Sequence, residues 1–237
     1  MRRAGLTARQ ALCNRTVIMT GAQPARDYWG SYYGRREAPV LPSQFALFVA
    51  NEIATGELPP VGTICDVGCG NGRDALFFLQ LGYQVLGLDA STAAIAACRE
   101  RLAGMSEDLA ARGRFVDGPA DQGSSWQDLG KGVAGPVLVY ARFFFHAIDD
   151  DAEAAVIAHA AELIGRNGGA FCAEFRTPED RDAAKVTPEH YRRFIDPQAF
   201  AARVAAAGLK PVWQAEGRGM AKYRQDDAHV ARLIATA

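Results

Sequence analysis

A glycine-rich turn between an apolar run and a helical segment is the part of the sequence best suited to chemistry. The run Ile64-Cys65-Asp66-Val67 carries one acid, and Gly68, Gly70 and Gly72 alternate directly after it. Glycines in such a turn permit positive φ angles and let backbone N–H groups approach a ligand closely. The pattern predicts a site for an adenosine-containing cofactor at the start of a helix.

Two other nucleotide-binding motifs do not fit this turn. The dinucleotide fingerprint GxGxxG would need a small residue at Arg73, and a P-loop would need Gly-Lys followed by Ser or Thr. What remains is GxGxG. The next apolar run, Gln84–Leu88, ends in Asp89, whose carboxylate can accept hydrogen bonds from both hydroxyls of a ribose.

Short apolar runs alternate with helical segments around this motif. Continuous apolar strands, each followed by a helix, are typical of a parallel sheet with helices on both faces. The expected strands are Thr63–Val67, Gln84–Leu88, Arg114–Val116, Val137–Ala141, Ala170–Phe175, Lys210–Gln214 and Val230–Ala235. The expected helices are Gln44–Ala54, Arg73–Leu81, Thr92–Leu102, Asp151–Ile164 and Pro197–Ala207. We expect an α/β fold, a Rossmann-like seven-stranded mostly parallel sheet with helices on both faces and an antiparallel last strand.

The length of 237 residues fits one domain with small appendages. We expect an N-terminal extension or lid over residues 1–40, a domain over 41–237, and a substrate-side insertion at 176–196. The 26 Lys and Arg against 27 Asp and Glu give a net charge of −1, which disfavours broad nucleic-acid binding. No apolar run approaches the ~20 residues of a membrane span. Residues 1–17 show no pattern of a secretory signal, so we expect a cytoplasmic protein without membrane insertion.

The five cysteines form no CxxC pair and are interpreted as small apolar fillers in a reduced compartment.

The segment Asp66–Ser91 resembles motif I and the acidic loop of class I S-adenosylmethionine-dependent methyltransferases, and Asp117-Gly118 follows in that family's order. The likeness covers roughly residues 40–237. It implies the cofactor S-adenosyl-L-methionine, with S-adenosyl-L-homocysteine as product. It also implies that Asp66 anchors the cofactor's amino group, that Gly68 and Gly70 pass under its methionine part, and that Asp89 holds the ribose. The remaining implied cofactor contacts are Asn71, Arg73, Ala90, Asp117, Gly118, Ala141 and Arg142. The sulfonium is already activated, so no metal is expected.

Transfer of a methyl group from a sulfonium needs an in-line nucleophile and, for a hydroxyl acceptor, a base. His146, beyond the fourth strand, is the candidate general base, and a structural histidine is the alternative. Arg142 could bind the methionine carboxylate or a substrate anion, or form a surface salt bridge. Tyr33, with Tyr28, Trp29 and Tyr32, could lie over the sulfonium, or cement the N-terminal segment to the core.

Four groups able to carry positive charge follow the fifth strand and bracket the expected pocket mouth: Arg176, His190, Arg192 and Arg193. They could clamp an anionic acceptor such as a phosphorylated or carboxylated sugar, or pair with nearby acids.

We expect methylation of a small-molecule or glycan acceptor, most simply O-methylation with a general base. The alternatives are an S- or heteroatom methyltransferase, because residues 68–83 resemble the thiopurine and tellurite branch, a nucleic-acid methyltransferase, or a non-catalytic cofactor-binding regulator.

Overall fold

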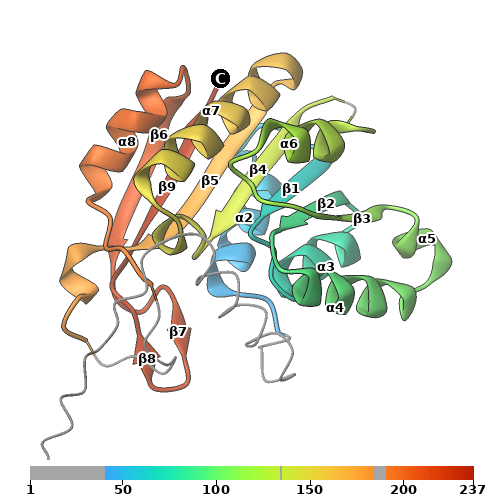
Figure 1. The fold of residues 1–237 in the computed structure, drawn as a ribbon, viewed down its shortest axis with the longest axis horizontal. Coiled ribbons are helices and arrows are strands. Elements are labelled where there is room, and N and C mark those ends of the chain that lie inside the picture. The colour runs from blue at the N-terminus through green and yellow to red at the C-terminus, as the bar shows by residue number, and fades with distance from the viewer. Residues whose placement is uncertain (1–40, 134, 184–190) are drawn as a thin grey trace, which may run out of the picture.

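The computed structural model describes residues 41–133, 135–183 and 191–237, and the core of this part is a seven-stranded sheet (Figure 1). The strand order is β3-β2-β1-β4-β5-β9-β6. Strands β1 to β5 pair in parallel, whereas β9 runs antiparallel to both β5 and β6. The strands are β1 (Thr63–Val67), β2 (Gln84–Asp89), β3 (Gly113–Asp117), β4 (Val137–Arg142), β5 (Gly169–Arg176), β6 (Lys210–Gly217) and β9 (Val230–Thr236).

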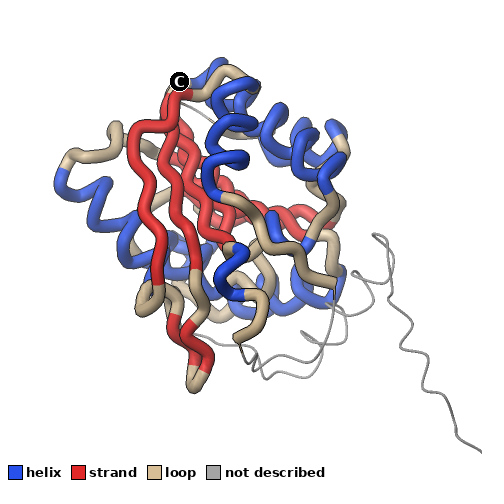
Figure 2. Tube along the Cα trace, turned by 90° about the vertical axis from the view of Figure 1, so that its left-hand side faces the viewer, coloured by secondary structure: helices blue, strands red, loops and turns tan. Residues whose placement is uncertain are grey.

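Helices cover both faces of the sheet, as Figure 2 shows from the side. One face packs on α2, α3 and α4, and the other on α6, α7 and α8. Successive strand residues contribute to opposite cores, as the pleat requires: Ile64 lies on the α2–α3 face and Cys65 on the α7 face. The helices are α2 (Gln44–Thr55), α3 (Arg73–Gln80), α4 (Thr92–Ala103), α5 (Glu107–Ala110), α6 (Gly123–Gly130), α7 (Asp150–Asn167) and α8 (Pro197–Ala206).

The expected α/β sheet with its antiparallel last strand is confirmed. Helices α5 and α6 and strands β7 and β8 were not expected. The short helix α6 has only Trp126 and Leu129 as large buried apolar side chains, so it shows no helical period. Helix α5 is a single turn. A second, two-stranded sheet of β7 (Lys222–Tyr223) and β8 (Asp226–Asp227) forms a hairpin that extends beyond the main sheet (Figure 1).

Strand β1 lies between β2 and β4. From β1 the chain builds the sheet outward through β2 and β3 on one side, and then returns to continue with β4 and β5 on the other side. In open α/β sheets, ligands bind outside the carboxyl ends of the strands at such a switch point. The glycine turn after β1, Asp89 at the end of β2 and Arg142 at the end of β4 all lie at this edge. Among the described helices, none is long and apolar enough to cross a membrane.

Candidate cofactor and acceptor site

The glycine turn between β1 and α3 is a left-handed path that only glycine adopts readily. The φ angles of Gly68, Gly70 and Gly72 are 72°, 54° and 74°. A side chain at Gly68 would also collide with Phe144, whose Cδ2 would lie 2.4 Å from the new Cβ. The amide of Gly68 donates to the carbonyl of Leu88 at 2.8 Å. The turn is therefore fixed against the end of β2.

Asp89 joins this turn to the next loop. Its Oδ2 accepts from the amide of Gly70 at 2.9 Å and its Oδ1 from the amide of Ser91 at 2.8 Å. Burial raises the pKa of Asp89 above its usual value, and these two hydrogen bonds oppose the rise. Each oxygen keeps acceptor capacity, so the carboxylate can still receive the two hydroxyls of a ribose.

The predicted adenine side lies beside Asp89. Asp117 at the end of β3 is the register partner of Asp89, and the amide of Gly118 donates to the Asp89 carbonyl at 3.0 Å. The side chain of Asp117 is exposed and Ala90 is half-buried. The structure thus brings the predicted ribose and adenine residues together along one edge.

Asp66 is a buried acid. It is 3% exposed, and the amide of Ala75 is placed to donate to its carboxylate. Burial, followed by the nearby carboxylates of Asp74 and Asp89, raises the pKa of Asp66 well above its usual value, and Arg142 opposes this. A group in this state is suited to receive a cationic donor, such as an ammonium.

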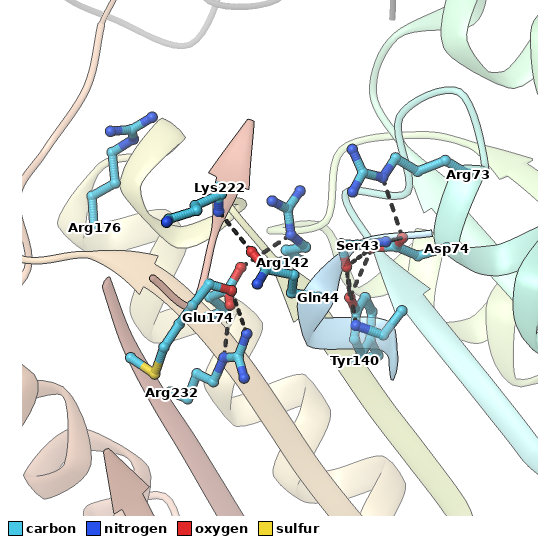
Figure 3. Close-up of polar contacts among 12 residues, drawn as sticks. Ser43, Gln44, Arg73, Asp74, Tyr140, Arg142, Glu174, Arg176, Lys222 and Arg232 are labelled. Atoms are coloured by element: carbon cyan, nitrogen blue, oxygen red, sulfur yellow. Dashed lines mark hydrogen bonds and ion pairs between the residues drawn. The ribbon is translucent and has the colours of Figure 1, made fainter. Parts of the chain in front are cut away.

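Asp74, the second residue of α3, is a site residue that the sequence analysis missed. Its carboxylate accepts from the Ser43 amide and hydroxyl, both at 2.7 Å, and from the Tyr140 hydroxyl at 2.8 Å (Figure 3). Burial by itself would raise the pKa of Asp74, but Arg142, Arg73 and the Ser43 hydrogen bonds bring it below its usual value. Ser43 also caps α2, so Asp74 ties the start of α2 to the glycine turn. The signal available was an acid in the first turn of a helix next to the glycine motif.

The end of β4 carries Arg142 and a strained Phe143. The guanidinium of Arg142 donates through Nε to Glu174 Oε1 at 3.0 Å and lies 4.2 Å from the centre of the Phe143 ring. Phe143 has φ 54°, a conformation unfavourable for a bulky residue. Ala141, one residue before Arg142, is fully buried beneath the site.

His146 lies in a short 3₁₀ turn (Phe145–Ala147) and is 3% exposed. Its Nδ1 accepts from the Arg176 amide in a long hydrogen bond of 3.4 Å, and its ring packs edge-on against Phe143 at 5.1 Å. With Nδ1 as acceptor, the neutral imidazole carries its proton on Nε2. A base role for the Nδ1 atom of His146 would therefore require this weak bond to open.

Two of the predicted substrate-binding arginines are held by acids. Arg176 is 5% exposed and pairs with Asp180 and Asp226, the latter at 2.7 Å. Arg193 pairs with Asp150 and Glu153 and donates to the carbonyl of Phe145 at 3.1 Å. Arg192 is half-buried next to it, while His190 and Tyr33 lie outside the described residues. The described arginines thus brace the loops around His146.

The β7–β8 hairpin contacts the start of α2. The side chain of Gln44 donates to the Gly219 carbonyl at 3.0 Å. It also accepts from the Lys222 amide at 2.7 Å (Figure 3). Arg176 reaches the same hairpin through Asp226. The hairpin, α2 and the end of β5 therefore form one wall beside Arg142, a wall that the sequence analysis did not anticipate.

Residues 65–170 match the family model described as Methyltransferase domain. A search of the curated proteins found no match.

Solved structures show the same fold at low identity. The glycopeptide N-methyltransferase MtfA bound to (S)-adenosyl-L-methionine is 20% identical with a TM-score of 0.61, over 82% of this chain and 94% of that one. The CcbJ methyltransferase from Streptomyces caelestis is 19% identical with a TM-score of 0.65, over 90% and 98%. A TehB-like SAM-dependent methyltransferase from Corynebacterium glutamicum is 16% identical with a TM-score of 0.57, over 90% and 97%.

Proposed function

Because residues 65–170 match a methyltransferase domain, we propose that the chain is a class I, S-adenosylmethionine-dependent methyltransferase that methylates a small-molecule or glycan-type acceptor, with His146 assisting the attack of a hydroxyl. The cofactor is S-adenosyl-L-methionine and the product S-adenosyl-L-homocysteine. The observation that carries the proposal is the joint geometry of Gly70 and Asp89, whose 2.9 Å hydrogen bond connects the glycine turn to the ribose acid.

The residues present fit this cofactor. Asp89 would hold the ribose and the exposed Asp117 would face the adenine, while the Gly118 amide, which donates to the Asp89 carbonyl, would hold the two strand ends together. Asp66, which is buried, would receive the amino group, whose charge favours the ionised carboxylate. The positive φ angles of Gly68 and Gly70 leave the backbone open to close approach, and Asn71 and Arg73 follow in the same turn. Arg142 would meet the carboxylate.

The bound cofactor supplies a sulfonium methyl group that is ready for in-line displacement. The chain's own task is to hold the acceptor opposite that methyl group and to take up a proton if the acceptor is a hydroxyl. His146, in the loop after β4, is the proposed proton acceptor once its 3.4 Å hydrogen bond to the Arg176 amide opens. The neighbouring Phe143 would form an apolar part of the acceptor wall.

We further propose that the acceptor is anionic. The guanidiniums of Arg176 and Arg193 are engaged by carboxylates, so they would shape the mouth of the site together with Arg192. Lys222 is exposed on the hairpin beside α2 and adds positive charge to the same wall. Because each of these two guanidiniums already faces two carboxylates, Lys222 is the group that would attract a carboxylated or phosphorylated sugar.

A matched pair of acceptors tests this proposal. Radiolabelled methyl transfer would be measured with a sugar carboxylate and with its neutral parent sugar, at low and high salt. We expect a lower KM for the carboxylate, and a KM that rises with salt for that acceptor alone. Equal KM values that do not depend on salt would contradict the anionic acceptor and favour a neutral substrate. The cofactor assignment would not be affected.

A further inference from the structure

Three charged side chains form a row across adjacent strands at the carboxyl end of the sheet. Arg142 on β4 is the register partner of Glu174 on β5, which in turn is the register partner of Arg232 on β9. Glu174 is fully buried and accepts from Arg142 Nε at 3.0 Å and from Arg232 Nε at 2.8 Å (Figure 3). Burial raises the pKa of Glu174, and the two guanidiniums oppose that rise.

This row of two arginines and one glutamate has one positive charge without a negative partner in the row. Two arginines face one glutamate, and the adjacent pair of Arg73 and Asp74 adds no net charge. A buried ion row of this kind is seldom retained for stability, because the cost of removing the charges from water offsets their attraction. Within the row itself, one guanidinium charge is therefore left that a bound anion could meet.

The guanidinium of Arg142 is held so that its two terminal nitrogens face away from the sheet. Its Nε is used by Glu174, and among the described residues no hydrogen bond is found for its two terminal nitrogens. Figure 3 shows these nitrogens on the side of the guanidinium away from Glu174, beyond the strand ends. The Phe143 ring stacks on the same guanidinium at 4.2 Å and limits its rotation.

Arg232 connects the row to the hairpin. Its terminal nitrogen donates to the carbonyl of Met220 at 2.6 Å, and its guanidinium lies over the rings of Phe45 and Phe48 of α2. Arg232, which is anchored to α2 and the hairpin, thus binds one side of Glu174, and Arg142 binds the other side.

We infer that Glu174 is a positioning residue: anchored by Arg232, it orients Arg142 so that the terminal nitrogens of Arg142 bind the carboxylate of the cofactor's methionine part. The inference rests on the proposed function. Asp66 supplies the complementary negative group for the amino nitrogen. It lies close enough to Arg142 for that arginine to oppose the rise in the pKa of Asp66. One acid and one guanidinium together match the two charges of an α-amino acid.

The test compares three nucleosides by calorimetry. S-adenosylhomocysteine has the whole amino acid, its decarboxylated analogue S-adenosyl-3-thiopropylamine keeps only the amine, and 5′-methylthioadenosine has neither group. For the wild type we expect S-adenosylhomocysteine to bind at least about tenfold more tightly than the decarboxylated analogue, as for a charge-assisted pair. In Glu174→Gln and Glu174→Asp this ratio should fall several-fold, while the affinity for 5′-methylthioadenosine stays at the wild-type value.

Arg142→Lys keeps the charge and loses the fork, so it should lower the same ratio even where Glu174→Gln fails to fold. Glu153→Gln is the matched control. Glu153 on α7 is likewise fully buried, and it pairs with two arginines, Arg193 and Arg203. It should leave the ratio unchanged. A wild-type ratio in Glu174→Asp and Arg142→Lys would overturn the inference. Absence of binding of all three nucleosides to the wild type would instead overturn the proposed function.

Discussion

The hydroxyl of Tyr140 donates to Asp74 Oδ2 at 2.8 Å, which joins the central strand β4 to the first turn of α3. Ser43 completes the contact from the start of α2. Three elements that are distant in the sequence therefore meet at one carboxylate directly behind the glycine turn.

This contact predicts an order of stabilities. Tyr140→Phe removes one neutral donor and should lower the free energy of unfolding by about 1 kcal/mol. Asp74→Ala leaves the Ser43 amide, the Ser43 hydroxyl and the Tyr140 hydroxyl without their acceptor, so its cost should be larger, about 3 kcal/mol. Urea denaturation of both variants measures the difference. Equal losses would show that the carboxylate is not the centre of the contact.

We expect the buried carboxylate of Asp66 to favour cofactor binding and to lower the free energy of unfolding of the ligand-free protein. Its pKa is raised in the folded state, so between the usual value of 3.8 and the raised value the folded protein holds a proton that the unfolded chain has released. The stability of the ligand-free protein must then fall as the pH rises through this window. Asp66→Asn removes that loss and should raise the free energy of unfolding near neutral pH by about 1 kcal/mol.

The same substitution should weaken S-adenosylhomocysteine binding, because the ammonium loses its carboxylate. Thermal melts of the ligand-free variant and wild type across pH, together with calorimetry, check both effects. A variant that is less stable than the wild type at every pH would contradict a raised pKa at Asp66.

His146→Ala should lower turnover by about 10²-fold or more while cofactor affinity stays nearly unchanged, as expected when a proton acceptor is lost. The measurement is single-turnover methyl transfer with a hydroxyl acceptor, followed across pH in the wild type and in the variant. Turnover within a few-fold of the wild type would make His146 structural. The acceptor would then be a better nucleophile, such as a thiolate or a neutral amine.

The sheet could be predicted from the sequence because its signals are local. Thr63–Val67 is a continuous apolar run before a glycine turn, and the structure gives β1 those same bounds. The predicted neighbours Asp89 and Asp117 also meet, because parallel strands end at one edge.

The polar contacts behind the site could not be predicted in this way. Glu174 meets Arg232 only because β9 inserts between β5 and β6, a pairing that no periodicity indicates. Arg176 pairs with the nearby Asp180, which was the alternative interpretation, and also with Asp226, which comes from the hairpin far along the chain. The sequence could indicate the local partner, but not the long-range one.

The most direct test of the account is a calorimetric titration of the wild type and Asp89→Ala with S-adenosylhomocysteine. Asp128→Ala, which removes an exposed acid paired with Lys131 on the surface, is the control. We predict one-to-one binding to the wild type and the control. Binding to Asp89→Ala should be weaker by about 2 kcal/mol, roughly 30-fold or more, because the ribose hydroxyls lose their acceptor. No binding to the wild type, or equal binding to Asp89→Ala, would contradict the assignment of this site to S-adenosylmethionine.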